Sequence, residues 1–300
     1  MAIDLSVKIG GINMKNPVTV ASGTFGYGLE YANLIDVTRL GAITVKGIRK
    51  DPCEGNKTPR IWEVRGGMLN AIGLQGPGVA GFAAEYMPFL RTTGVPVIVN
   101  IWGTTIDGYV ETAEALEEVP GIDGLEINVS CPNVKHGGAS FGGNPETMKS
   151  VVQAVRRVTK RNLITKVAPN VPDVRVFALA AEEAGSDALA ISNTIPAMAI
   201  DIEARRPALA NTTGGLSGPA LHPVAVKLVW DAASVVKIPI IGMGGIMEPA
   251  DAIEFLAAGA TAVAVGTANF IDPTTPLRVI DGIAEYMERH GMERVSDIRL

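Results

Sequence analysis

The chain has few of the residues that form disulfides or bind metals. It contains two cysteines and three histidines among its 300 residues. Two cysteines cannot build a disulfide framework, and the three histidines are spread along the chain without the spacing of metal ligands. The sequence therefore excludes a disulfide-stapled scaffold and predicts no metal site.

Long apolar runs and an excess of positive charge are also absent. No run approaches the roughly 18 apolar residues of a membrane span, and the N-terminus lacks a basic region followed by an apolar core. The 26 basic and 31 acidic residues give a net charge of −5, whereas nucleic acids and anionic membranes attract a basic surface. We therefore expect a cytoplasmic protein that binds neither nucleic acid nor membrane.

The remaining composition is that of a compact enzyme. Apolar residues make up 47% of the chain and charged residues 19%, and 34 glycines indicate many tight connections. Although 300 residues often form two domains, α/β barrels of this size fold as one. We expect a single domain over residues 1–300.

Short apolar runs alternate with helical patterns along most of the chain. A small β-hairpin is predicted first, over residues 5–14, with its turn at Gly10 and Gly11. The predicted strands are 18–21, 42–46, 95–100, 125–130, 163–167, 188–192, 239–243 and 262–266. The predicted helices are 28–39, 79–92, 109–118, 145–160, 174–184, 223–235, 249–258 and 277–290. Eight strand–helix units predict an α/β fold, a (β/α)₈ TIM barrel with an N-terminal β-hairpin; the alternative is a doubly wound open sheet.

Two connections are longer than ordinary turns between a strand and a helix. Residues 47–77 follow the second strand and residues 194–218 follow the sixth. Both leave the carboxyl ends of strands, where barrel enzymes place their chemistry. We expect these segments to cover a site.

The stretch 124–138 carries the strongest chemical signal. Leu125, Ile127 and Val129 alternate with polar residues, so the polar face of this strand must meet a ligand or a polar network. The strand stops at Pro132, which places the thiol of Cys131 at its carboxyl end. A small buried hydrophobe is the alternative interpretation of a lone cysteine.

Polar side chains end several other predicted strands. Lys46, Asn100, Asn128, Lys166 and Asn193 follow apolar runs at the same end of the expected barrel. Any one of them could be an exposed end residue. Together they predict a flat, hydrogen-bonding ligand that carries negative charge.

Glycine turns after the last two barrel strands suggest a phosphate site. Residues 242–246 and 266–268 precede helices, where backbone amides approach a phosphate, and the glycine-rich segment 214–218 could close over the same group. Ordinary turn glycines are the alternative. A planar polar ligand with a phosphate and two lysines beside it suits flavin mononucleotide (FMN). A sugar-phosphate isomerase is a competing hypothesis, but its carboxylate base is missing from the strand ends.

These segments resemble one enzyme family. The resemblance rests on residues 44–47, 68–74, 128–133 (Asn-Val-Ser-Cys-Pro-Asn), 191–194, 215–219 and 241–246. In them the chain resembles the dihydroorotate dehydrogenases over essentially its whole length. A cysteine base resembles class 1, and Val134 to Gly138 resembles class 1B, the catalytic FMN subunit of the NAD-linked enzyme. The fumarate-dependent class 1A homodimer is the alternative within the family, and a non-catalytic flavin-binding barrel is the alternative outside it.

The resemblance implies a role for each matching position. Cys131 would be the catalytic base. Substrate would be held by Lys46, Asn70, Ala71, Ile72, Gly73, Leu74, Asn128, Asn193 and Thr194. One FMN per chain would be held by Ser22, Lys46, Gly47, Asn100, Asn128, Lys166, Ser192, Gly218, Gly244, Gly245, Gly266 and Thr267. Two positions depart from the family pattern, Gly76 and Glu248, and both lie beside the expected site.

The implied reaction is the oxidation of (S)-dihydroorotate to orotate in pyrimidine biosynthesis, with NAD as the final acceptor. Class 1B relatives pass electrons through a second subunit that carries FAD and a [2Fe–2S] cluster. Such a cluster needs about four cysteine ligands, and this chain has two cysteines. We therefore expect both groups on a partner subunit, in a heterotetramer built around a homodimer of this chain. Cys53 is expected to be an ordinary residue of a surface loop.

Overall fold

A computed structural model describes residues 3–129 and 141–300 of the chain. Its centre is a sheet of eight parallel strands in the order β3-β16-β15-β10-β9-β8-β7-β4. Their bounds are β3 (Val18–Val20), β4 (Ile43–Ile48), β7 (Val97–Ile101), β8 (Gly124–Asn128), β9 (Asn162–Val167), β10 (Ala188–Ile191), β15 (Ile240–Met243) and β16 (Ala262–Val265).

The two edge strands of this sheet, β3 and β4, meet and nearly close the barrel. The Gly41 amide donates to the Val18 carbonyl at 2.9 Å, and the Thr19 hydroxyl donates to the Ala42 carbonyl at 2.9 Å. Their approach covers the two edges that an open sheet would expose to solvent. The predicted (β/α)₈ barrel is confirmed, and the open-sheet alternative is wrong.

Helices surround the barrel and cover its outer face. They are α1 (Gly78–Glu85), α2 (Met87–Thr93), α3 (Ile106–Glu117), α4 (Pro145–Val158), α5 (Val174–Glu183), α6 (His222–Ala233), α7 (Pro249–Ala257), α8 (Ala268–Ile271) and α9 (Thr275–His290). The start of α4 shows why the sequence forms a helix there. The Asn144 carboxamide accepts a hydrogen bond from the Glu146 amide at 2.8 Å, and Pro145 occupies the first helical position.

Two predicted helices differ from the structure. The segment 28–39 forms two short 3₁₀ turns, η1 (Leu29–Tyr31) and η2 (Val37–Arg39), because the Asp36 carboxylate accepts from the Thr38 amide and the chain is extended there. The predicted helix 79–92 is split into α1 and α2 at Tyr86, just before Pro88. Both corrections change the outer layer and leave the barrel strands as predicted.

The N-terminal hairpin is confirmed and closes the bottom of the barrel. It consists of β1 (Val7–Ile9) and β2 (Ile12–Met14), which pair antiparallel. Ile9, Ile12 and Met14 are buried in one apolar cluster with inward-facing barrel residues such as Ile98 and Ile164. The hairpin therefore fills the end of the barrel at which the strands begin.

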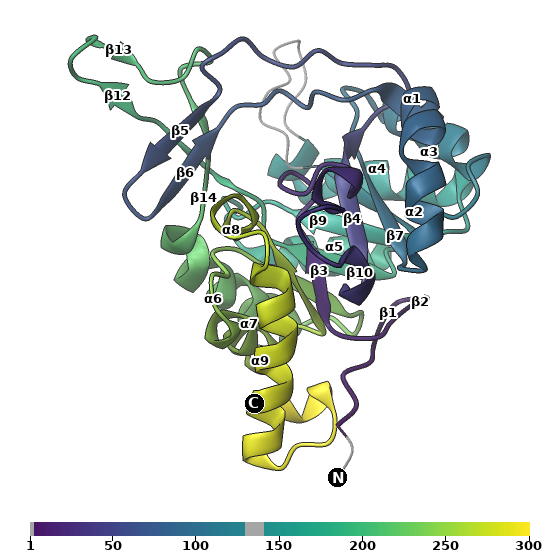
Figure 1. Cartoon of the computed structure of the whole chain (residues 1–300). Coiled ribbons are helices and arrows are strands. Elements are labelled where there is room, and N and C mark those ends of the chain that lie inside the picture. Colours follow the sequence, from purple (N-terminus) through teal and green to yellow (C-terminus); the bar gives the residue numbers. More distant parts are fainter. Residues whose placement is uncertain (1–2, 130–140) are drawn as a thin grey trace.

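The two long connections form a second sheet above the other end. Four strands pair antiparallel in the order β11-β14-β6-β5, with β5 (Ile61–Val64) and β6 (Gly67–Asn70) from the first connection, and β11 (Ile195–Ala197) and β14 (Gly214–Ser217) from the second. A further hairpin, β12 (Ile200–Asp201) with β13 (Arg206–Pro207), projects beyond them (Figure 1). No helix within residues 3–129 and 141–300 combines the length and apolar character needed to cross a membrane.

Candidate active site

A cavity of about 330 Å³ lies where the barrel strands end and the second sheet begins. Its walls come from both layers, and it holds every residue that the sequence assigned to substrate or FMN. These are Ser22, Lys46, Gly47, Asn70, Ala71, Ile72, Gly73, Leu74, Asn100, Asn128, Lys166, Ser192, Asn193, Thr194, Gly218, Gly244, Gly245, Gly266 and Thr267. Cys131 lies outside the described residues.

The barrel contributes the polar floor. The register places Asn128 beside Lys166 on the neighbouring strand, and Asn100 beside Glu126. Alternate residues of a strand point to opposite faces, so these side chains share the barrel interior with the apolar layer below them. The amide of Asn193 reaches back to the Asn128 side chain at 3.3 Å.

The second sheet contributes the roof. The strands β6 and β14 pair, and the Asn70 amide approaches the Gly215 carbonyl at 3.5 Å. After β6 the chain takes left-handed backbone angles at Gly73 and at Leu74, with φ of 77° and 55°. A leucine in this region is strained, and such strain concentrates at ligand sites.

The cavity is electropositive. Lys46 and Lys166 line it, and no aspartate or glutamate does so in the described part of the chain. Burial lowers the pKa of Lys46 below the 10.5 of an ordinary lysine, the nearby Arg60 charge lowers this pKa further, and Glu30 has a smaller opposite effect. The Lys166 ammonium lies 3.6 Å from the buried Glu126 carboxylate. The arrangement suits an anionic ligand.

Backbone without side chains shapes one end of the cavity. Gly244 and Gly245 have positive φ angles, and a Cβ on Gly245 would lie 2.8 Å from the Gly218 carbonyl oxygen. At Gly266, by contrast, an added Cβ would meet only the Ala21 methyl, at 3.6 Å. This end therefore presents peptide groups to an open space, as a phosphate site requires.

The residues present fit a flavin cofactor. The Asn100 side-chain oxygen is buried and has no hydrogen-bond partner among the described residues, so it is ready to accept from a planar ring N–H. Lysine ammonium groups and the glycine end supply charge and amides for the remaining groups of such a ligand.

Several residues that line the cavity were not predicted from the sequence. Phe270 is half exposed at the mouth, one helical turn after Thr267, and Met243 ends β15 beneath the glycine turn. Ser217 was noted only as part of a glycine-rich segment, yet its hydroxyl accepts from the Thr267 hydroxyl at 2.7 Å. Phe270 could have been predicted, because it lies three residues, about one helical turn, after Thr267. Met243 could not, because an apolar residue at the end of a buried strand looks like part of the core.

The two positions that depart from the family pattern are accommodated locally. Asp251 accepts hydrogen bonds from the amides of Met247 and Glu248, at 2.8 and 2.9 Å, so the start of α7 is capped without a small residue at Glu248. Gly76 pairs through its backbone with Cys53, in both directions at 2.9 Å. Cys53 is half buried, and its backbone helps to hold the loop that forms the roof.

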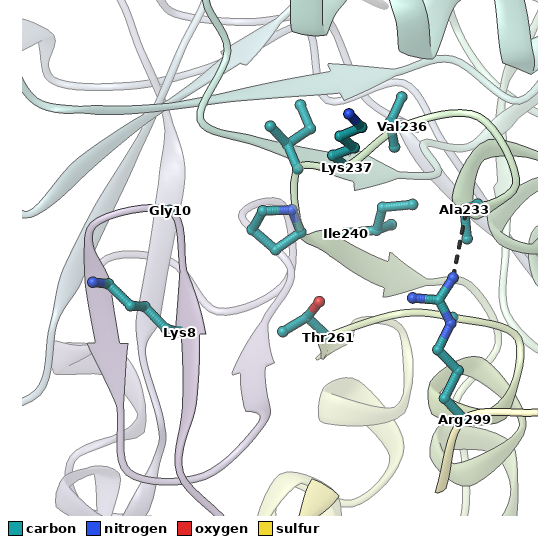
Figure 2. Close-up of a pocket in the computed structure, with 11 residues that line it drawn as sticks. Lys8, Gly10, Ala233, Val236, Lys237, Ile240, Thr261 and Arg299 are labelled. Carbon is teal, nitrogen blue, oxygen red and sulfur yellow. Dashed lines mark hydrogen bonds between the residues drawn. The ribbon is translucent and has the colours of Figure 1, made fainter. Parts of the chain in front are cut away.

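A second cavity, of about 250 Å³, lies at the opposite end of the barrel, near the first residue of β15, Ile240 (Figure 2). Lys8, Lys237 and Arg299 lie on different sides of its rim, and the Arg299 guanidinium approaches the Ala233 carbonyl at 3.4 Å. These cations do not converge on one point, so this cavity is not the candidate active site.

Comparison with known proteins decides the family. The sequence model of dihydroorotate dehydrogenase matches residues 4–287. The chain belongs to the dihydroorotate dehydrogenase family. It is 53% identical over 295 residues to a protein of Geotalea uraniireducens named dihydroorotate dehydrogenase B (NAD(+)), catalytic subunit, covering 98% of this chain and 97% of the relative. A protein of the same name from Thermoanaerobacter pseudethanolicus is 50% identical over 296 residues, covering 99% and 98%.

A solved structure of the family supports the fold. The dihydroorotate dehydrogenase of Eimeria tenella, determined in complex with ferulenol, superposes with a TM-score of 0.82 at 26% identity. The match covers 98% of this chain and 87% of that one. Family membership and barrel architecture thus agree with the resemblance found in the sequence motifs.

Proposed function

We propose that this chain is the catalytic subunit of an NAD-linked dihydroorotate dehydrogenase and oxidises (S)-dihydroorotate to orotate in pyrimidine biosynthesis. One observation carries the proposal: the residues expected to hold substrate and FMN line a single cavity that has two lysines and no carboxylate in its described part. The names of the NAD-linked relatives support the choice of class.

FMN would lie with its phosphate at the glycine end of the cavity, held by Gly244, Gly245, Gly266 and Thr267. Its ring would be held by the polar floor, including Asn100 and Lys166. When bound, FMN supplies a two-electron acceptor for the hydride that leaves C6 of the substrate.

Dihydroorotate would lie between the floor and the roof. Lys46 would bind the substrate carboxylate, and the amides of Asn70, Asn128 and Asn193 would orient the ring. Cys131 would remove the C5 proton as general base. Loss of this proton and of the C6 hydride would convert dihydroorotate into orotate. The roof would exclude water from the reacting carbons.

Electrons would leave through a partner. The word "subunit" in the names of the relatives implies one. We propose that the partner carries FAD and a [2Fe–2S] cluster, because the two cysteines of this chain cannot supply the roughly four thiolates of a cluster. A homodimer of this chain with two such partners would form a heterotetramer.

Anaerobic reduction tests the proposal. Purified protein loaded with FMN is mixed with (S)-dihydroorotate, with the (R) enantiomer as matched control, and the flavin absorbance is followed. Bleaching by the (S) form alone supports the activity, and no bleaching by either form refutes it. NAD and fumarate are then compared as oxidants: NAD reduction that requires an added iron–sulfur flavoprotein supports class 1B, whereas turnover with fumarate replaces it by class 1A.

A further inference from the structure

Glu126 is an ionisable residue in the inner wall of the barrel. Its neighbours on the adjacent strands are Asn100 and Ile164, and it is 1% exposed. Branched apolar side chains usually fill this layer of a TIM barrel, as Ile164 and Ile98 do here. A carboxylate at this depth is costly unless other groups compensate it, so its partners matter.

One oxygen of Glu126 meets two groups that line the active-site cavity. The Asn100 carboxamide nitrogen donates to Glu126 Oε1 at 2.5 Å, and the Lys166 ammonium lies 3.6 Å from the same oxygen. Glu126 itself is not among the residues that line the cavity. It therefore acts from beneath, through the two residues that do.

The first contact fixes the orientation of Asn100. A carboxylate only accepts hydrogen bonds, so the amide nitrogen must face Glu126 and the amide oxygen must face the other way. That oxygen is directed toward Gly47, where an added Cβ would lie 2.7 Å from it, and it has no partner among the described residues. The orientation leaves a buried acceptor at the cavity wall.

The second contact opposes the charge of Lys166. A positive charge beside a flavin favours the reduced form, which carries more negative charge than the oxidised form. The Glu126 carboxylate, 3.6 Å from the ammonium, weakens this preference for the reduced form. At the distance of the flavin, the opposite unit charges of Glu126 and Lys166 largely cancel.

We propose that Glu126 is a positioning residue for FMN: it orients Asn100 to accept a hydrogen bond from the imide N–H of the ring, and it moderates the charge of Lys166 and so lowers the reduction potential of the flavin. The inference rests on the proposed function only in taking FMN as the ligand. It assigns the carboxylate to tuning the cofactor, and gives it no contact with the substrate.

The substitution Glu126→Gln tests the charge. Glutamine keeps an oxygen that accepts from Asn100 but removes the negative charge. We expect the ratio of reduced to oxidised FMN at a fixed potential to rise about tenfold, a shift of about +30 mV for a two-electron couple. The measurement is a dithionite titration against a reference dye, which needs no dihydroorotate. Glu117→Gln is the matched control, because it also removes a carboxylate from an ion pair, with Arg161 at 3.3 Å. Glu117 lines a different cavity, which none of the proposed FMN-binding residues lines.

The substitution Glu126→Asp tests the orientation. Aspartate keeps the charge but is one methylene shorter, so it loses its reach to Asn100. We expect the FMN dissociation constant of the reconstituted apoprotein to rise about tenfold, with a potential close to that of the wild type. If Glu126→Gln does not fold, this variant alone decides the orientation.

Two results would overturn the inference. A potential that is the same in Glu126→Gln and Glu117→Gln refutes the moderation of charge, and an unchanged FMN dissociation constant in Glu126→Asp refutes the positioning of Asn100. Failure of the proposed function looks different, since the wild-type protein would then bind no FMN or would not be reduced by dihydroorotate.

Discussion

The glycine end of the cavity permits a prediction with an internal control. Gly245 and Gly291 both adopt left-handed backbone angles, with φ of 68° and 65°. A Cβ on Gly245 would lie 2.8 Å from both the Gly218 oxygen and the His222 Cβ, whereas a Cβ on Gly291 would meet nothing within 4 Å. Substitution by alanine at the two positions therefore imposes similar backbone strain, and crowding only at the first.

The magnitudes follow from these two effects. Left-handed angles cost a non-glycine residue about 1 kcal/mol, and overpacking adds about 1–3 kcal/mol. We expect Gly245→Ala to lower the free energy of unfolding by about 2–4 kcal/mol, and Gly291→Ala by about 1 kcal/mol. With an unfolding entropy of about 2.1 cal/mol/K per residue, this 300-residue chain should lose about 3–6 °C of Tm at the first position and about 2 °C at the second.

The assay is thermal unfolding of both variants without cofactor, followed by FMN titration. Because Gly245 is proposed to contact the phosphate, its substitution should also raise the FMN dissociation constant at least about tenfold, whereas Gly291→Ala should leave it unchanged. Equal losses of Tm in the two variants would refute the crowding argument. A wild-type FMN dissociation constant in Gly245→Ala would refute the phosphate assignment.

Three further predictions concern the substrate side. Cys131→Ser should retain FMN and slow its reduction by dihydroorotate about 10²–10⁴-fold near neutral pH, measured by stopped-flow absorbance, because general-base removal costs this much; a wild-type rate would contradict the assignment. Protonated Lys46 is proposed to bind the orotate carboxylate, and its pKa is lowered by burial and by Arg60, so orotate affinity should fall as pH rises through a value below 10.5. In Arg60→Met the pKa of Lys46 rises and the fall should move to higher pH, as a series of orotate titrations will show; identical profiles would exclude the coupling. Asn70→Ala should raise the KM for dihydroorotate about tenfold without changing the FMN dissociation constant, and the reverse pattern would mean that the roof covers the cofactor.

The barrel could be predicted from the sequence because its signals are local. Each strand is a short apolar run, and each run is followed by helical periodicity, so the alternation alone indicates the fold. The roof could not be predicted this way. Its strands β6 and β14 pair residues such as Leu69 and Leu216, which are far apart in the sequence. In the sequence these segments look like long loops.

The candidate site was predicted for similar reasons. Strand ends and glycine turns are visible in the sequence, and a barrel brings the carboxyl ends of its strands together. The alternation at 124–130 also indicated a polar network, but not its members. That Glu126 shares one oxygen between Asn100 and Lys166 depends on the register of three adjacent strands, which no single segment encodes.

The apolar hairpin at the bottom of the barrel has a kinetic consequence. Ile9, Ile12 and Met14 seal that end of the described interior with hydrophobic side chains, so solutes exchange with the cavity through the opposite end. With substrate and FMN bound there as proposed, a small-molecule oxidant that uses this same opening would have to wait until the product has left, and parallel lines in double-reciprocal plots would report that order. A partner protein that takes electrons at the surface of the subunit would not compete for the opening.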